Sequence, residues 1–391
     1  MFVNAVYPPE PGATGILLSE LAPALARRGW EVEVVTSGRP EADEPKADEP
    51  PGVRVRRVRP ARRPRSVWRR GLSTGPLVLR LLAAAGRSGP ADAVVLAADP
   101  PLLFLAQRWI RRRTGAAVLH WAHDLYPDVA LALGVRVPAH RALAALARRA
   151  LRRCDAVVAI GRDVARRIRA AGVAADRVTV IPNWATGPAQ PGGRDSAVRQ
   201  SLGLGDAFVV MYAGTLGRAH PFDAVLEAAA EWQQTDPDVV VVVVGGGVCR
   251  PDVEAAAQRR GLGNVRFVPP VASAALGDTL RAADLHLVTM DPHTEGMLVP
   301  SKTYGALAAG RPVLFLGPAG SEVALMLSEH SVGTVLDATD GAALAQCVRR
   351  WRDDADGRRE AGDRAVRVAS GGLERAADAF DGVLRQITSQ P

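Results

Sequence analysis

The sequence predicts an α/β protein made of two doubly wound, Rossmann-like domains that face a central cleft. Strand-like apolar segments alternate with amphipathic helical segments twice along the chain, and such alternation is typical of parallel sheets covered by helices. A stretch rich in Gly, Pro and Ser at residues 184–197 interrupts the rhythm between the two series. A length of 391 residues is sufficient for two domains of about 150 residues each.

The first series predicts an N-terminal domain at residues 1–183. Apolar runs rich in Val and Ala indicate strands, and apolar positions at helical spacing indicate helices. The strands are expected at residues 1–7, 31–37, 92–98, 116–122, 156–161 and 177–183, and the helices at 14–29, 101–115, 139–154 and 162–172.

The second series predicts a C-terminal domain at residues 206–372, after a linker at 184–205. Its strands are expected at residues 208–214, 238–247, 265–270, 285–290 and 312–317, and its helices at 221–234, 250–261, 273–284 and 301–310. Residues 373–391 are expected to form a helix that returns to the N-terminal domain. Open parallel sheets bind ligands beyond the carboxyl ends of their strands, so the cleft is the expected ligand site.

Composition excludes several classes of protein. The longest apolar runs are far shorter than the roughly 20 residues of a membrane-spanning helix, and the first residues lack the pattern of a secretory signal. We therefore expect a cytoplasmic protein. The cysteines Cys154, Cys249 and Cys347 are far apart in sequence, so they predict neither a disulfide framework nor a zinc site, and we expect buried thiols.

Positive charge is concentrated in one segment. The net charge is +8, and nine arginines with no acidic residue lie between Arg54 and Arg70. Such a run can contact an anionic membrane or a nucleic acid, or it can be a solvated loop. Residues 68–86 continue as an amphipathic, arginine-flanked segment, which favours a peripheral position at the inner membrane face.

A phosphate-binding pattern is present, but it is not that of a dinucleotide enzyme. The best match to G-x-G-x-x-G, residues 245–250, has Arg250 in place of the last glycine, so the sequence argues against an oxidoreductase. In the first domain, Gly12 and Gly15 precede a helix and would let the backbone approach a phosphate or a sugar. Ordinary turns use glycines in the same way.

The strongest candidate for an anion site is Lys302. It is one of two lysines among 49 basic residues, and it follows Ser301 at the start of a predicted helix. Ser301 is expected to be the N-cap, so the amides of Lys302, Thr303 and Tyr304 would lack intrahelical partners and favour an anion. The alternative is a Ser-capped helix with a solvent-facing lysine.

Seven segments in order resemble a known family, the GT-B fold glycosyltransferases of family 4, and among them the colanic-acid and O-antigen type sugar transferases. The segments are "YPPEPGATGILLSELAPALARRGWEVEVVTS", "DAVVLAADPPLLFLA", "AHDLYPDVALALG", "VIPNWA", "VVMYAGTLG", "NVRFVPPV" and "VPSKTYGALAAGRPV". They cover nearly the whole chain. The resemblance implies a GT-B fold and a retaining transferase that uses a nucleotide diphosphate sugar, expected to be a UDP-sugar.

The resemblance also assigns roles to residues. His123 matches the histidine that faces the donor sugar, and Asp124 lies beside it. Gly214 corresponds to backbone near the diphosphate. Ser301, Lys302 and Thr303 correspond to the phosphate-binding helix start, and Gly246 and Val268 correspond to the base and ribose side. For His123, Asp124, Gly246 and Val268, ordinary roles in caps, turns and strands remain as alternatives.

Two departures from the family pattern affect these roles. An arginine and a lysine that relatives commonly carry are here Thr215 and His220, and either Arg218 substitutes for them or it is an exposed arginine. The usual pair of glutamates is replaced by Met297 and Gly305. Glu295 lies two residues before the first of these positions, so it is either a sugar contact or a loop residue.

The expected mechanism needs no metal and no cofactor. Lys302, with Arg218, would stabilise the charge that develops on the leaving diphosphate, and the strings DPD (236–238) and DAD (354–356) are interpreted as solvated. The acceptor would be a lipid-linked saccharide or a small natural product, and the sugar a hexose or an N-acetylhexosamine. A non-hydrolysing nucleotide-sugar epimerase of the same fold and a basic nucleic-acid-binding protein are the alternatives.

Overall fold

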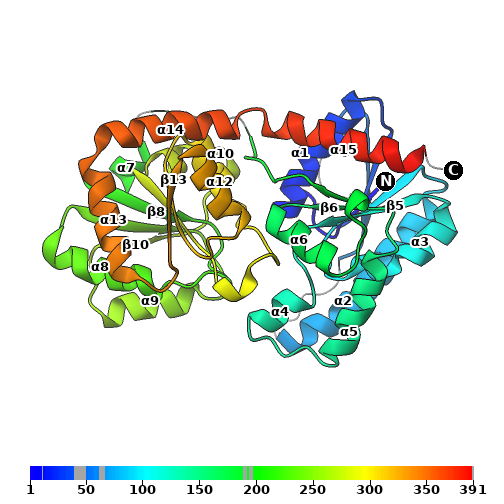
Figure 1. The fold of residues 1–391 in the computed structure, drawn as a ribbon, viewed down its shortest axis with the longest axis horizontal. Helices are drawn as coiled ribbons and strands as arrows, with labels where there is room; N and C mark the ends of the chain where they lie inside the picture. Colours follow the sequence, from blue (N-terminus) through cyan, green and yellow to red (C-terminus); the bar gives the residue numbers. More distant parts are fainter. Residues whose placement is uncertain (11, 39–49, 61–66, 188–191, 193–196, 390–391) are drawn as a thin grey trace. The chain divides into compact units, whose positions relative to one another are not determined.

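The computed structural model describes residues 1–10, 12–38, 50–60, 67–187, 192 and 197–389. The chain divides into two compact units, shown as a ribbon in Figure 1. Unit 1 comprises Met1–Asn183, Gly296–Leu298 and Leu373–Pro391, and unit 2 comprises Trp184–Glu295 and Val299–Gly372. The chain therefore leaves unit 2 for three residues at Gly296–Leu298 and again after Gly372.

Unit 1 contains a seven-stranded parallel sheet in the order β3-β2-β1-β4-β5-β6-β7. The strands are β1 Phe2–Val3, β2 Val32–Ser37, β3 Val53–Val58, β4 Ala93–Leu96, β5 Ala117–Ala122, β6 Ala156–Ala159 and β7 Val178–Val180. Strands β4 and β6 are buried along their whole length, as expected for strands covered on both faces.

Helices cover both faces of this sheet. They are α1 Ala13–Arg27, α2 Val67–Arg87, η1 Leu103–Ala106, α3 Gln107–Thr114, α4 Asp128–Ala132, α5 His140–Leu151, α6 Arg162–Ala170, η2 Ala175–Arg177 and α15 Gly372–Thr388. Helices α1 and α15 lie on one side of the sheet and α2, α3 and α5 on the other (Figure 1).

The last helix is fixed to unit 1 by apolar and ionic contacts. The ring of Phe380 packs edge-on against Trp121 of β5, with 5.1 Å between ring centroids. Arg28, which follows α1, contacts Glu374 at 2.7 Å and Asp378 at 2.6 Å. Because these partners are separated by about 350 positions, they close unit 1 between the two ends of the chain.

Unit 2 contains a six-stranded parallel sheet in the order β10-β9-β8-β11-β12-β13. The strands are β8 Phe208–Ala213, β9 Val239–Val244, β10 Val265–Val268, β11 Leu285–Thr289, β12 Val313–Leu316 and β13 Gly333–Leu336. The helices are α7 Ala197–Ser201, α8 Asp223–Thr235, α9 Arg250–Arg259, α10 Ser273–Arg281, η3 Pro292–Thr294, α11 Lys302–Ala308, α12 Glu322–His330, α13 Gly341–Asp353 and α14 Ala355–Ala369.

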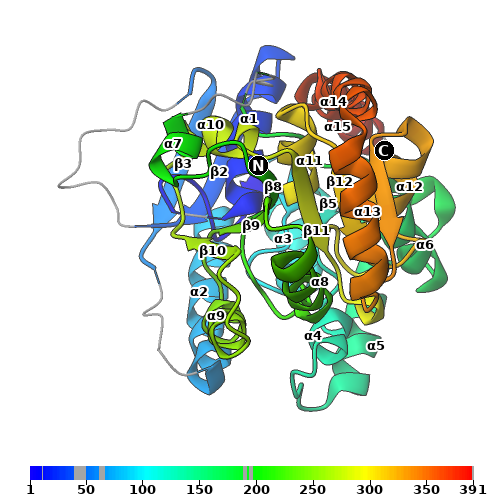
Figure 2. The same ribbon diagram turned by 90° about the vertical axis from the view of Figure 1, so that its left-hand side faces the viewer.

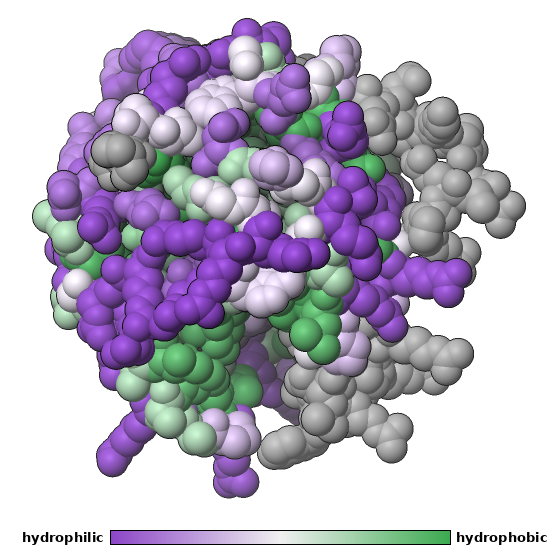
Figure 3. Space-filling model, turned by 90° about the vertical axis from the view of Figure 1, so that its right-hand side faces the viewer, coloured by the Kyte–Doolittle hydropathy of each residue, from purple (hydrophilic) through white to green (hydrophobic). Residues whose placement is uncertain are grey.

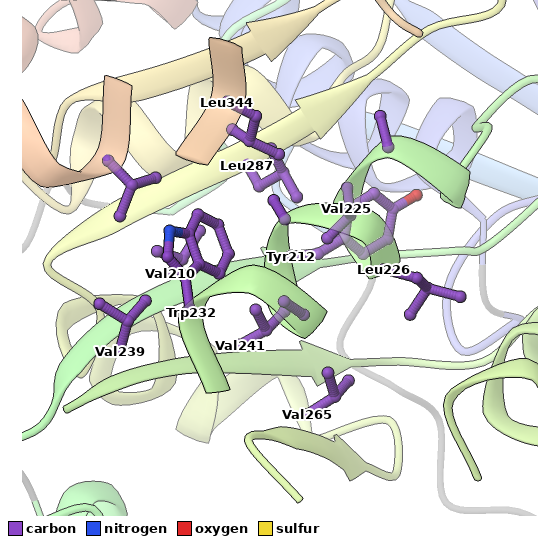
Figure 4. Packing of buried hydrophobic residues seen from close by; sticks show 14 of the residues in the cluster. Val210, Tyr212, Val225, Leu226, Trp232, Val239, Val241, Val265, Leu287 and Leu344 are labelled. Carbon is purple, nitrogen blue, oxygen red and sulfur yellow. The ribbon is translucent and has the colours of Figure 1, made fainter. Parts of the chain in front are cut away.

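A dense apolar core packs against one face of the sheet of unit 2. Helices α8 and α13 lie side by side over it (Figure 2). Trp232 of α8 is fully buried among Val210, Val239 and Leu344, and its indole N–H donates to the carbonyl of Ala345 at 3.5 Å (Figure 4). All six valines of β9 are buried. This packing fixes the carboxyl end of β8, where Tyr212 lies.

The predicted fold class is confirmed, because both sheets are parallel and covered by helices. Strand β3 was missed. It lies in the arginine run, where Val53, Val55 and Val58 form an edge strand, and Arg56 contacts Glu33 at 2.9 Å. The alternative of a solvated loop is therefore wrong for residues 53–58, whereas residues 61–66 lie outside the described residues. In the described part of the chain, no helix has the length and apolar character to cross a bilayer.

Candidate functional site

Lys302 is held at the carboxyl edge of the sheet of unit 2 by two neutral side chains. Its Nζ donates to the hydroxyl oxygen of Tyr212 at 2.8 Å and lies 3.0 Å from Nε2 of His220. The ammonium also lies over the ring of Tyr212, 4.6 Å from the centroid. Tyr212 belongs to the end of β8, which pairs with β11, so the site forms beyond two neighbouring strands.

The protons of this cluster can be assigned from its backbone contacts. The hydroxyl of Tyr212 donates to the carbonyl of Thr215 at 2.9 Å, and Nδ1 of His220 lies 2.6 Å from the carbonyl of Thr289. Since a carbonyl only accepts, Nδ1 carries the proton and Nε2 accepts from Lys302. An ammonium has three N–H groups, so two hold it in place and the third is available to a ligand.

The electrostatics of the cluster favour an anionic ligand. Burial lowers the pKa of Lys302 to about 7, and burial followed by the charge of Lys302 lowers the pKa of His220 to about 3. Burial raises the pKa of Tyr212. Among the described residues, no carboxylate forms an ion pair with Lys302. A desolvated cation without a counter-charge is costly, so an anion at this place would be strongly stabilised.

Gly214 makes room for the lysine. Its φ is 142°, which side-chain-bearing residues rarely adopt, and a Cβ atom there would lie 2.9 Å from Cε of Lys302. The next loop needs glycine as well, because a Cβ on Gly245 would lie 2.2 Å from the carbonyl oxygen of Gly214. The two loops therefore stack backbone on backbone beside Lys302.

The start of α11 differs from the sequence expectation. Ser301 has helical dihedrals, is exposed, and makes no capping hydrogen bond. The amides of Thr303 and Tyr304 already donate to the carbonyls of Pro300 and Ser301, at 3.3 and 3.2 Å. The expectation of three unpartnered amides is therefore wrong for two of them, because this seven-residue helix begins with a tight turn. The hydroxyl of buried Thr303 also donates to Pro300.

The other residues predicted to bind the donor are spread around this cluster. Thr215 is exposed and contributes its carbonyl to Tyr212. Arg218 is exposed, and no described contact connects it to Lys302. The carbonyl of Gly246 accepts from the Leu216 amide at 2.7 Å, and the carbonyl of Val268 accepts from Arg250 at 2.7 Å and from the Gly245 amide at 3.0 Å. The carbonyls of Gly246 and Val268 thus form hydrogen bonds that hold the loops after β8 and β9 in place.

Glu295 is the last residue of unit 2 before the short excursion. It is half-buried and follows η3, and its amide donates to the carbonyl of Pro292 at 3.3 Å. The next residues belong to unit 1, where the carbonyl of Met297 accepts from the Leu125 amide at 2.9 Å and the Gly296 amide donates to buried Asp163 at 3.2 Å. The backbone of Met297 therefore contacts Leu125, the residue that directly follows Asp124.

His123 and Asp124 follow β5 at the carboxyl edge of the sheet of unit 1. His123 is buried against Trp121, with 4.6 Å between ring centroids, and its Nε2 has no hydrogen-bond partner within the described chain. Burial, with a smaller effect of His120, lowers its pKa to about 3. A neutral imidazole with an unsatisfied nitrogen can bind a hydroxyl group.

Asp124 has a second carboxylate for a neighbour, which the sequence did not single out. Burial and the charge of Asp99 raise the pKa of Asp124 to about 6. Asp99 lies beyond the end of β4, which pairs with β5. The signal was present in part, because Asp99 and Asp124 each follow a strand predicted from the sequence. The pair makes this edge of unit 1 locally acidic.

Gly12 and Gly15 have a packing role at the start of α1. A Cβ on Gly12 would lie 2.6 Å from Cγ1 of Val6, and one on Gly15 would lie 2.8 Å from the carbonyl oxygen of Val6. Both glycines therefore let α1 approach the segment after β1.

Within the described residues, no three His, Cys, Asp or Glu side chains gather as metal ligands would.

Comparisons with known proteins identify the family of this chain. Residues 12–184 match the glycosyl transferase 4-like domain, and residues 207–354 match glycosyl transferases group 1. The D-inositol 3-phosphate glycosyltransferase of Rhodococcus erythropolis is 32% identical over 341 residues, which cover 82% of this chain and 74% of the relative. The Escherichia coli K12 protein WcaI, assigned to colanic acid biosynthesis, is 29% identical over 234 residues, 57% of either chain.

Solved structures share the fold at low sequence identity. Anabaena HepE, determined in complex with UDP, has a TM-score of 0.71 at 18% identity, covering 98% of this chain and 99% of its own. Sucrose-phosphate synthase from Thermosynechococcus elongatus has a TM-score of 0.76 at 19% identity, covering 99% and 98%. With the two matched domains and the relatives above, these likenesses show that the chain belongs to the GT-B glycosyltransferases, with a 4-like first domain and a group 1 second domain.

Proposed function

We propose that this protein is a retaining glycosyltransferase that takes a sugar from a UDP-sugar, and that Lys302 binds the diphosphate of the donor. The observation that carries the proposal is the half-buried ammonium of Lys302, held by the neutral acceptors Tyr212 and His220 without an ionic partner in the described chain. A diphosphate supplies the missing negative charge. A solvent-facing lysine would not be oriented by a buried tyrosine and a half-buried histidine.

The proposed reaction uses this cation at the moment of bond cleavage. The bond between the sugar C1 and the β-phosphate oxygen breaks, and negative charge grows on the diphosphate beside Lys302. The acceptor hydroxyl forms the new bond to C1 on the same face and gives its proton to the leaving phosphate oxygen. A preorganised donor of this kind typically contributes about 10²-fold or more to turnover. The scheme needs no metal.

The relatives support the choice of donor and leave two classes of acceptor. Anabaena HepE was determined with UDP and with UDP-glucose, which supports a uridine base and a hexose over an N-acetylhexosamine. Among the relatives, WcaI is assigned to colanic acid biosynthesis and other proteins are inositol 3-phosphate glycosyltransferases. A lipid-linked saccharide and a small polar acceptor are therefore the two classes to test.

In unit 1 we propose that His123 binds a sugar hydroxyl through its unpartnered Nε2. Its low pKa keeps the imidazole neutral at physiological pH, so it binds by hydrogen bonding and adds no charge. Asp124, whose pKa is raised to about 6, lies beside His123 and is the proposed acceptor of a hydrogen bond from a substrate hydroxyl other than the one that reacts.

The test is donor binding and turnover in matched variants. A panel of nucleotide sugars is screened for thermal stabilisation, and hydrolysis and transfer are then measured for the wild type, Lys302→Ala and Lys46→Ala. We expect UDP-sugars to stabilise the wild type and Lys302→Ala to lose about 10² in turnover, while Lys46→Ala, which removes the only other lysine, is unchanged. Equal turnover in Lys302→Ala would refute the role. Interconversion of the nucleotide sugar without an acceptor would instead support an epimerase.

A further inference from the structure

We propose that one face of unit 1, formed by α3 and the end of α5, docks on an anionic phospholipid bilayer. Six arginines line a surface hollow of about 560 Å³: Arg108, Arg111, Arg112, Arg152, Arg153 and Arg177. We call this group the arginine cluster. The inference goes beyond the proposed transfer, and the binding itself is measured without any transfer reaction.

The cluster carries a large excess of positive charge, although Asp176 directly precedes Arg177. Residues 103–114 and 140–153 contain nine arginines and no acidic residue. Asp155 is the one acidic side chain that lines the hollow, and it is already bound by Arg111 and by the Val118 amide, the latter at 2.7 Å. Burial and the nearby cations Arg149 and Arg108 lower the pKa of Arg153. Arginines held this close repel one another, and an anionic surface would relieve the repulsion.

Two large apolar side chains are exposed on the helices that carry the cluster. Of the five large hydrophobic residues that are strongly exposed in the described chain, Trp109 lies on α3 and Leu146 on α5, with exposed fractions of 43% and 51%. Trp109 directly follows Arg108 on α3 and packs near Gly86 of α2. Leu146 and Arg149 are three residues apart, so they share one side of α5.

The combination of charge and apolar surface selects the partner. Figure 3, which shows one face of unit 1, has hydrophobic patches next to strongly hydrophilic surface. Arginines attract the phosphates of anionic lipids, and Trp and Leu side chains insert at the boundary between headgroups and acyl chains. A soluble phosphate compound or a nucleic acid would engage the arginines but would leave Trp109 and Leu146 in water. A bilayer uses both features.

The cluster lies away from the candidate site in unit 1. Arg177 directly precedes β7, Asp155 directly precedes β6, and α3 ends before β5, so the cluster surrounds the amino ends of these strands. His123 follows the carboxyl end of β5. Docking through the cluster would therefore leave the opposite edge of the sheet open to substrates. The proposal does not use the arginines between Arg54 and Arg70.

The test is sedimentation of the full chain with vesicles. We compare phosphatidylcholine vesicles with vesicles that also contain phosphatidylglycerol, using the wild type and the triple variant Arg108→Gln, Arg112→Gln, Arg153→Gln. The matched control removes the same charge from exposed positions of unit 2: Arg259→Gln, Arg260→Gln, Arg367→Gln. A second pair tests the apolar side chains, with Trp109→Ser, Leu146→Ser against the exposed control Val248→Ser.

We expect the wild type to bind only the anionic vesicles, the arginine triple to bind them at least tenfold more weakly, and its control to change less than twofold. Trp109→Ser, Leu146→Ser should bind several-fold more weakly than Val248→Ser. Equal losses in the two arginine triples would overturn the proposal, since net charge alone would then explain binding. An unchanged Trp109→Ser, Leu146→Ser variant would also overturn it and would indicate a soluble polyanion. Thermal stabilisation by UDP-glucose, measured in every variant, reports the proposed donor site separately and should be unchanged.

Discussion

Binding of a diphosphate at Lys302 should draw a proton from solution. Burial lowers the pKa of the free ammonium to about 7, so at pH 8 only about one lysine in ten is protonated. A diphosphate in contact favours the charged form and moves the pKa back toward the ordinary value of 10.5. Binding at pH 8 is therefore expected to take up about 0.9 proton per UDP-sugar.

The interaction free energy between Lys302 and the diphosphate follows from the change in the pKa of Lys302. Restoring the pKa from about 7 to 10.5 corresponds to an upper limit of about 5 kcal/mol of interaction between the cation and the anion. Because binding raises the pKa of Lys302, it also determines how the affinity depends on pH. The dissociation constant should rise with pH above 7, approaching about tenfold per pH unit, because the proton needed for binding becomes scarcer.

The assay is titration calorimetry with UDP-glucose at pH 8 in two buffers of different ionisation enthalpy. The diphosphate of UDP-glucose carries no group that titrates near this pH, so the buffer-dependent heat reports protein groups. Lys302→Met should bind more weakly and show no proton uptake, and Lys46→Met should behave as the wild type. A wild-type heat that does not depend on the buffer, or the same uptake in Lys302→Met, would refute the protonation argument.

Four further outcomes follow from the same contacts. Gly214→Ala puts a Cβ at a φ of 142° and 2.9 Å from Cε of Lys302. We expect the unfolding free energy to fall by about 1 to 3 kcal/mol and UDP-glucose to bind more weakly in calorimetry. The control Gly217→Ala, whose Cβ would meet no atom within 4 Å, should change neither quantity. His220→Ala removes an acceptor of the Lys302 ammonium, so proton uptake on binding should change, and an identical uptake profile would contradict the hydrogen bond. Phe380→Ala leaves a cavity against Trp121 in unit 1 and should lower the unfolding free energy by about 3 to 5 kcal/mol in denaturant titration, a loss that a freely attached α15 would not show. Treatment with EDTA should leave transfer unchanged, and recovery of activity on adding Mg²⁺ would show that a metal takes part.

The neutral partners of Lys302 explain one departure from the family pattern. Relatives commonly carry a lysine at the position of His220, and a lysine there would place a second ammonium about 3 Å from that of Lys302. His220 instead offers a lone pair, because its Nδ1 proton is committed to Thr289. The histidine therefore suits a site that keeps its single cation at position 302.

Much of the fold was determined by the local pattern of the sequence. Alternating apolar runs and amphipathic segments predicted the parallel sheets, because strands buried on both faces must be apolar throughout. Strand β3 escaped because its valines alternate with arginines, as an edge strand allows. The rarity of lysine singled out Lys302, and the resemblance to relatives singled out His123 and Asp124, without any structure.

Tertiary structure decided how these residues meet. Lys302 is 90 positions from Tyr212 and 82 from His220, and periodicity along a segment carries no information about contacts at such separations. Asp99 and Asp124 become neighbours only because β4 pairs with β5. The three-residue return of Gly296–Leu298 to unit 1 leaves no trace in hydropathy. Sequence fixes which segments can be buried, whereas strand order and side-chain packing fix which polar groups face one another, and the chemistry of the site depends on the latter.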